Sequence, residues 1–179
     1  MLSNISFKYS LCGSEGSGRE NCQKALRLCL EDYLGEPSTG ELAINNHLFL
    51  DTYPQFSVST SHTQNLGAVI LADRATFPSV GIDIEFQNRK VPIGGEKYFR
   101  NDQDEDFESL ILWTLKEAAF KALSPKIHQF ERKTLLLKDI WCRGDSFGLL
   151  GRDENLGTLS HFLEDFKGLW VQVSLAFLK

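Results

Sequence analysis

The chain has 179 residues, of which 42% are hydrophobic and 24% are charged, and its net charge is −5. This composition is typical of a globular protein, and the length suits one domain or two small lobes that share a core. An acidic chain has no general attraction for nucleic acid, so we exclude a nucleic-acid partner. Any anionic ligand must be held by a local group of basic side chains.

The cysteines and the start of the chain indicate the compartment. The four cysteines form no C-x-x-C pair and no zinc-finger spacing; they are Cys12, Cys22, Cys29 and Cys142. We therefore predict reduced thiols rather than disulfides or a zinc site. Residues 1–5 show no signal-peptide pattern, and no apolar run reaches the length of a membrane span. We expect a cytoplasmic protein without a membrane partner.

In the first half of the chain the pattern predicts one helix followed by strands. Residues 10–18 are rich in Gly and Ser and are expected to form a loop. Apolar residues then repeat at helical spacing over 19–34, and Gly35 is a natural end for that helix. Beyond it we predict a short strand or hairpin over 42–50, and strands over 56–61, 66–72 and 80–85.

The second half repeats this order. A polar loop over 87–95 precedes a helix over 107–123, which Ser124 and Pro125 would end. Strands are predicted over 134–140, 146–150, 161–166 and 169–177. A weak similarity between LGAVILAD and LWVQVSLA also suggests two related halves. We predict an α+β fold in a single compact unit of two similar lobes, residues 1–85 and 86–179, each with a long helix on a small, mostly antiparallel sheet.

The strand VGIDIE, residues 80–85, carries two acids on one face. Successive side chains of a strand point to opposite faces, so Asp83 and Glu85 lie on the same side, about 7 Å apart. The three apolar residues of the strand face the core. Because like charges so close together repel, a positive group is expected between the two acids.

The predicted helix contains WTLKEAAFKAL, residues 113–123, in which Glu117 and Lys121 lie on one face. The simplest interpretation is a surface ion pair worth about 0.3–0.5 kcal/mol. With Asp83 and Glu85, however, Glu117 makes a set of three carboxylates. Hard oxygen ligands of this kind suit Mg²⁺, and Lys121 could then hold a phosphate oxygen.

The segment STSHT, residues 59–63, adds a histidine among hydroxyls, a donor-rich stretch suited to phosphate. The order of STSHT, GIDIE and WTLKEAAFKAL resembles the Ser-His, Gly-x-Asp-x-Glu and Trp-x-x-Lys-Glu-x-x-x-Lys motifs of the 4′-phosphopantetheinyl transferases. The resemblance runs from about residue 19 to the end of the chain. It is to the larger, two-lobed, surfactin-synthetase-activating subfamily, and it implies that family's pseudo-dimeric fold.

The resemblance implies a role for each acid. Asp83, Glu85 and Glu117 would coordinate Mg²⁺, or Mn²⁺, together with the pyrophosphate of coenzyme A as co-substrate. Glu117, or Glu85 through a metal-bound water, would take the proton from the acceptor serine. All three acids, with Lys121, would thus belong to the catalytic site.

It also implies a set of residues that bind coenzyme A. Lys121 and His62 would contact phosphate oxygens, and Ser61 lies beside them. Arg19, ahead of the first helix, would meet the 3′-phosphate. Lys116 falls on the first lysine of the helix motif.

The activity implied by the resemblance is transfer of phosphopantetheine from coenzyme A to a serine of an acyl, peptidyl or polyketide carrier protein, with release of 3′,5′-ADP. Such carriers serve fatty-acid, polyketide or nonribosomal-peptide biosynthesis. They are generally acidic, so a local basic patch is needed to meet one. The candidates are Arg89, Lys90, Lys97, Arg100 and Lys126. Two fused lobes would supply in one chain the interface that the small synthases build between subunits, so we expect a monomer.

The sequence departs from the family pattern in two places. The segment between Glu85 and Trp113 is short, and Asn46, His47 and Leu48 stand where the family has Gly-Lys-Pro near the adenine. Two alternatives stay open. Another metal-dependent phosphoryl enzyme would use the same acids and lysine. A non-catalytic member of the family would bind coenzyme A or a carrier without turnover.

Overall fold

The structure is a computed structural model that describes residues 7–13, 15–35, 37–38, 42–130, 133–152 and 154–179. Within these residues the chain is α+β, with two α-helices and two five-stranded antiparallel sheets, as predicted. The N-terminal residues 1–5, which we compared with a signal peptide, lie outside the described ranges. None of the described helices has the length and apolar character needed to cross a bilayer.

The elements follow one another from a short N-terminal strand to a long C-terminal hairpin. In chain order they are β1 (Phe7–Gly13), α1 (Gly18–Leu34), β2 (Ile44–Asn45), β3 (Phe49–Leu50), β4 (Phe56–Thr63), β5 (Leu66–Asp73), β6 (Ser79–Phe86), η1 (Gly95–Tyr98), α2 (Ser109–Leu123), η2 (Ser124–Phe130), η3 (Leu137–Asp139), β7 (Ile140–Arg143), β8 (Ser146–Leu149), β9 (Gly157–Phe166) and β10 (Leu169–Leu178).

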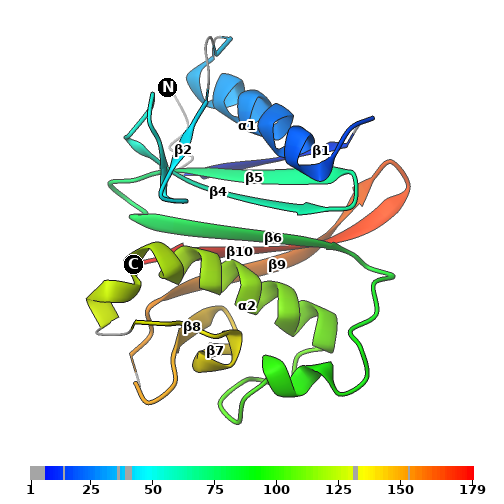
Figure 1. Cartoon of the computed structure of the whole chain (residues 1–179), viewed down its shortest axis with the longest axis vertical. Helices are drawn as coiled ribbons and strands as arrows, with labels where there is room; N and C mark the ends of the chain where they lie inside the picture. The colour runs from blue at the N-terminus through cyan, green and yellow to red at the C-terminus, as the bar shows by residue number, and fades with distance from the viewer. Residues whose placement is uncertain (1–6, 14, 36, 39–41, 131–132, 153) are drawn as a thin grey trace.

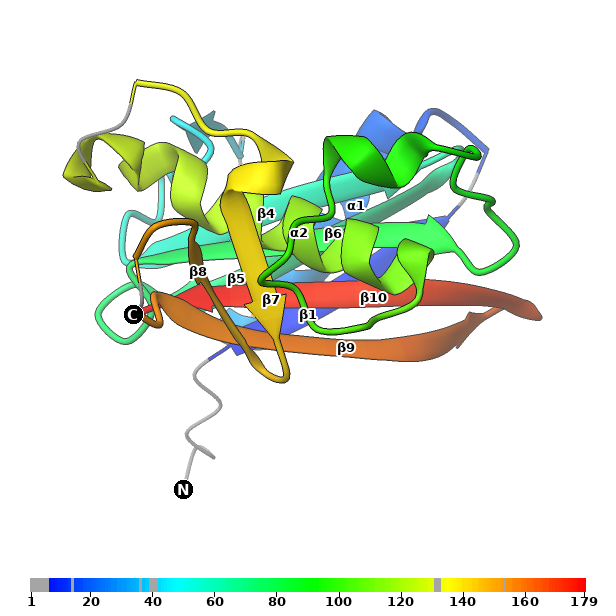
Figure 2. The ribbon, with the colours of Figure 1, turned by 90° about the horizontal axis from the view of Figure 1, so that it is seen from below.

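The two sheets pack face to face, and each helix covers one outer face (Figure 1). Their strand orders are β1-β5-β4-β3-β2 and β6-β10-β9-β8-β7. Apolar side chains of β5 meet those of β6 and β10 in the central core. On the outer faces, α1 packs on β4 and β5, while α2 packs on the second sheet, along β6 and β10 (Figure 2). This arrangement is compatible with the two predicted lobes.

The strand β6, which carries the acids, joins the two halves. It pairs along its length with β10, so its backbone belongs to the second sheet. The sheets therefore divide the chain between Asp73 and Ser79, earlier than the boundary predicted at residue 85. On its other side β6 lies beside β4, whose Ser59 Oγ accepts a hydrogen bond from the Ile82 amide at 3.3 Å.

Two glycines let the helices approach the sheets closely. A Cβ on Gly81 would lie 1.9 Å from the carbonyl oxygen of Ala118 in α2. A Cβ on Gly67 would lie 2.2 Å from the amide nitrogen of Cys22 in α1. Each helix thus rests directly on strand backbone at these points. On β6 this contact is only two residues from Asp83.

The helix ends follow from local chemistry. Ser17 and Glu20 form a capping box at the start of α1, and Gly35 ends it in the left-handed conformation, with φ 75°. The second helix begins at Ser109 rather than at 107. Beyond Ser124 the chain continues as the 3₁₀ segment η2 instead of stopping, because Pro125 falls in the first turn, where its missing N–H costs nothing.

Two predictions of secondary structure were wrong. Residues 10–13, expected in a loop, form the second half of β1 and pair with β5. Residues 134–140, expected as a strand, contain η3, where the Asp139 carboxylate accepts from the Leu136 amide at 2.9 Å. That local bond competes with a strand ladder. The four cysteines are free thiols, as predicted.

Candidate functional site

Asp83 lies at the junction of β4, β6 and α2 and is only 6% exposed. Its Oδ1 accepts hydrogen bonds from Ser61 Oγ at 2.7 Å and from Lys121 Nζ at 2.8 Å. Its Oδ2 is buried and has no hydrogen-bond partner. Buried carboxylate oxygens normally accept at least one hydrogen bond. The unpaired oxygen is therefore suited to a cation or to a donor from a ligand.

Glu85, two residues along the same face, is also buried and fully engaged. Its Oε2 accepts from Thr63 Oγ1 at 2.9 Å, and its Oε1 forms an ion pair with Arg89. The predicted cation between the two acids thus has counterparts in the chain itself. Lys121 neutralises Asp83, and Arg89 neutralises Glu85.

Glu117 lies half-buried on α2, on the side of the helix that faces Asp83. Burial raises the pKa of Glu117, and repulsion from the Asp83 carboxylate raises it further, while Lys121 and Arg89 oppose the shift. The two acids are therefore within electrostatic reach of each other. A carboxylate whose pKa is raised toward neutrality is a better proton acceptor than an ordinary one.

The three predicted metal ligands fit a hard cation in part. In the part of the chain that the structure describes, no three His, Cys, Asp or Glu side chains converge as a metal-binding group. The unpaired oxygen of Asp83 and the neighbouring Glu117 nevertheless supply the donors that Mg²⁺ prefers. Both oxygens of Glu85 already have a partner, so a cation bound there would lie close to the positive charge of Arg89 and be repelled by it.

His62 and Arg19 lie together at the start of α1. A Cβ on Gly18 would lie 2.8 Å from the Cβ of His62, so the histidine packs against the first residue of the helix. Arg19 follows directly, and both basic side chains are exposed. Ser61, the neighbour of His62, points the other way and binds Asp83. Its placement makes it a residue that orients the acid.

Lys116 is not part of this cluster. It is completely buried, and its Nζ lies 2.7 Å from the carboxylate of Asp104 and donates to the carbonyl oxygens of Phe99 at 2.5 Å and Ile140 at 2.7 Å. Burial lowers the pKa of Lys116, and Asp104 opposes that shift. All three donors of the ammonium group are in use within the protein. The structure therefore supports a structural role for Lys116. The coenzyme A contact that the resemblance implied stays a prediction.

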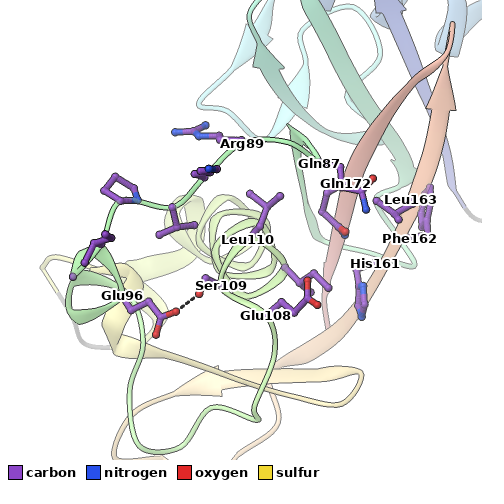
Figure 3. Close-up of a pocket in the computed structure, with 16 residues that line it drawn as sticks. Gln87, Arg89, Glu96, Glu108, Ser109, Leu110, His161, Phe162, Leu163 and Gln172 are labelled. Carbon is purple, nitrogen blue, oxygen red and sulfur yellow. Dashed lines mark hydrogen bonds between the residues drawn. The ribbon is translucent and has the colours of Figure 1, made fainter.

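Two cavities are lined in part by a basic partner of the acids, although none of the three acids is among the lining residues of either. The first has a volume of about 290 Å³, and its lining residues are Ile44, His47, Val58, Ser59, Thr60, Phe120, Lys121 and Ser124. The second, of about 980 Å³, lies between the loop 87–95, the start of α2 and β9, with Arg89 on its edge (Figure 3). A third, more apolar cavity of about 470 Å³ shares Arg89 and includes Trp113.

Two partners of the acids were not identified in these roles from sequence. Thr63 was noted only as a neighbour of His62, although it alternates with Ser61 on one face of β4. Arg89 was considered only for a carrier-binding patch. Of the other basic candidates, Lys90 and Lys97 line the cavities, and Arg100 forms an ion pair with Glu96 at 3.0 Å.

Comparison with known proteins adds no assignment, since no protein-family model and no curated protein matches the sequence.

Proposed function

We propose that the chain is a 4′-phosphopantetheinyl transferase that modifies a serine of an acyl, peptidyl or polyketide carrier protein. The observation that carries this proposal is the environment of Asp83. One of its oxygens is shared by Ser61 and Lys121, and the other is buried without a partner. The interacting residues come from three separate motifs, and each motif resembles one of that family.

Phosphoryl transfer requires placement and neutralisation of charge more than covalent help from the protein. Mg²⁺, held by Asp83 and Glu117, would supply Lewis-acid stabilisation of a diphosphate. Lys121 would hold a phosphate oxygen while it keeps Asp83 oriented. His62 and Arg19, at the start of α1, would bind the remaining phosphate charge of coenzyme A.

The proton of the acceptor serine would pass to Glu117. Its raised pKa, caused mainly by burial and further by the Asp83 carboxylate, makes it a stronger base than an ordinary carboxylate. The serine oxygen would bond to the phosphorus that bears pantetheine. The bond from this phosphorus to the bridging oxygen would break, and 3′,5′-ADP would leave with that oxygen.

Two cavities, one that includes Lys121 in its lining and one that includes Arg89, are consistent with a reaction of two substrates. His47 lines the smaller one and comes from the segment that corresponds to the family's adenine contact. The larger one is bordered by Arg89 and Lys90, whose charges suit an acidic carrier. The α+β architecture is compatible with the family's pseudo-dimeric fold, in which one chain forms the whole site. We therefore expect a monomer.

The proposal is tested by intact-mass spectrometry on a panel of acyl, peptidyl and polyketide carriers incubated with coenzyme A and Mg²⁺. We expect one carrier to gain about 340 Da, the mass of one phosphopantetheine group. The Asp83→Ala variant should remain folded but should add no mass to any carrier. Coenzyme A binding without modification of any carrier would favour the binding-module alternative. Release of 3′,5′-ADP without carrier modification would favour another phosphoryl enzyme.

A further inference from the structure

Of the two partners of Glu85, Arg89 is the one that another cation could replace. Thr63 holds the other oxygen of Glu85 from within β4, whereas Arg89 belongs to the turn after β6, where its amide donates to the Phe86 carbonyl at 2.9 Å. The Arg89 side chain is 51% exposed, and the side chain of Glu85 is 7% exposed. The ion pair thus joins a buried acid to a cation at the surface.

The charge of Arg89 acts beyond Glu85. It also lowers the pKa of Glu117, against the effects of burial and of Asp83. The same guanidinium group therefore attracts two of the three acids, Glu85 through a direct ion pair and Glu117 over a longer range. A divalent cation at these acids would meet a positive charge already in place, and the two cations would repel each other.

We propose that Arg89 competes with the divalent cation for Glu85 and thereby sets the metal affinity of the site. This inference rests on the proposed function, because it requires that the acids bind a metal. A guanidinium group and a divalent cation at the same oxygen of Glu85 would repel each other, so metal binding through Glu85 weakens or displaces the Arg89 ion pair. Arg89 also lines the cavity of about 980 Å³, at the opposite side from Glu108 (Figure 3).

If Arg89 competes with the metal, removal of its charge has a different effect on metal affinity than removal of a purely structural residue would have. If Arg89 only stabilised the loop, its loss would weaken the site or leave its metal affinity unchanged. If Arg89 competes for Glu85, its loss frees a carboxylate and removes a repulsive charge. The Arg89→Gln variant should then bind the metal more tightly than the unaltered protein does.

The test is a Mn²⁺ titration of the full chain with saturating coenzyme A, in which free Mn²⁺ is followed by electron paramagnetic resonance. We expect Arg89→Gln to bind Mn²⁺ about three- to tenfold more tightly, as removal of a competing, partly exposed ion pair predicts. Arg89→Lys should fall between this variant and the unaltered protein. Lys90→Gln, which removes the same charge one residue further along the same cavity, should change the affinity by less than about twofold.

A second measurement is the melting temperature of each variant, without metal and with Mn²⁺. Arg89→Gln should melt at a lower temperature, because Glu85 loses a partner, and Mn²⁺ should raise its melting temperature more than that of the unaltered protein. An affinity of Arg89→Gln equal to or below that of the unaltered protein, or an equal gain in Lys90→Gln, would overturn the inference and leave the proposed function standing. Absence of Mn²⁺ binding by the unaltered protein with coenzyme A would overturn both.

Discussion

Lys121 of α2 lies 2.8 Å from Asp83 of β6, across 38 positions of sequence, and its ammonium group also donates to the Ile82 carbonyl at 2.9 Å. The lysine therefore fastens the helix to the acid strand. The helical spacing alone suggested a surface pair with Glu117 four residues earlier. The long-range pair is more significant, because Asp83 is buried and its second oxygen has no partner.

Replacement of Lys121 by Met should reduce transfer by at least about 100-fold, since it removes both a phosphate contact and the group that orients Asp83. It should also cost about 1–3 kcal/mol of unfolding free energy, because Asp83 keeps only Ser61 as a donor. Steady-state kinetics and urea unfolding give the two numbers. Lys138→Met, at an exposed lysine of η3 that has no proposed role in the site, is the matched control. Near-normal transfer by Lys121→Met would contradict the proposed site.

The positions of the acids were predictable because strand alternation fixes a shared face. Asp83 and Glu85 lie together on β6 as expected, and α2 brings Glu117 near them. Their partners were not predictable, because the Arg89 pair depends on a turn and the Lys121 pair on helix packing. Lys116 shows how helix geometry separates two lysines of one motif. It lies five residues before Lys121, about 140° around the helix, and its ammonium group is buried against Asp104 instead of lying near Asp83.

Local sequence pattern also explains why the bounds of α1 were predicted correctly and the strand β1 was not. The helix α1 has apolar periodicity and clear caps, and its bounds were found within one residue. The strand β1 has the sequence FKYSLCG, in which Phe7, Tyr9 and Leu11 occupy alternate positions, and it pairs with β5, which lies 53 to 65 positions further along the chain. This alternation is a strand signal, and it was missed because residues 10–18 were assigned to a loop on their Gly and Ser content.

Gly81 is expected to be essential for the geometry of the site. In Gly81→Ala the new methyl group would meet the Ala118 carbonyl oxygen at 1.9 Å, so α2 must move away from β6. We expect a loss of about 1–3 kcal/mol of unfolding free energy, and a larger fractional loss of transfer as Lys121 leaves Asp83. Gly95→Ala is the control, because its Cβ would make only ordinary contacts of 3.5 Å or more. Equal behaviour of the two variants would show that helix contact does not position the site.

Lys116→Met separates a structural role from a role in binding. The change leaves the Asp104 carboxylate buried without its cation, which should cost about 3–5 kcal/mol of unfolding free energy. The double variant Lys116→Met with Asp104→Asn should recover part of this loss, because it removes the unpaired charge and keeps an oxygen that can accept from the Cys142 amide. The KM for coenzyme A, measured on the folded fraction of each variant, should stay within about twofold of the original. A raised KM at unchanged stability would instead restore Lys116 to the coenzyme A site.

Glu117→Gln should show that the ionised Glu117 carboxylate lowers the free energy of unfolding. Folding raises the pKa of Glu117 above the ordinary 4.5, chiefly by burial, so the folded chain binds this proton more tightly than the unfolded chain does. Stability contributed by the protonated acid is therefore lost as pH rises from 4.5 through the raised pKa. In metal-free buffer at neutral pH, Glu117→Gln should be more stable than the unaltered protein and should lack this pH dependence, while its transfer activity disappears. Urea unfolding across the acidic to neutral range measures the difference. Lower stability of Glu117→Gln at neutral pH would mean that attraction to Lys121 and Arg89 outweighs burial and the repulsion from Asp83.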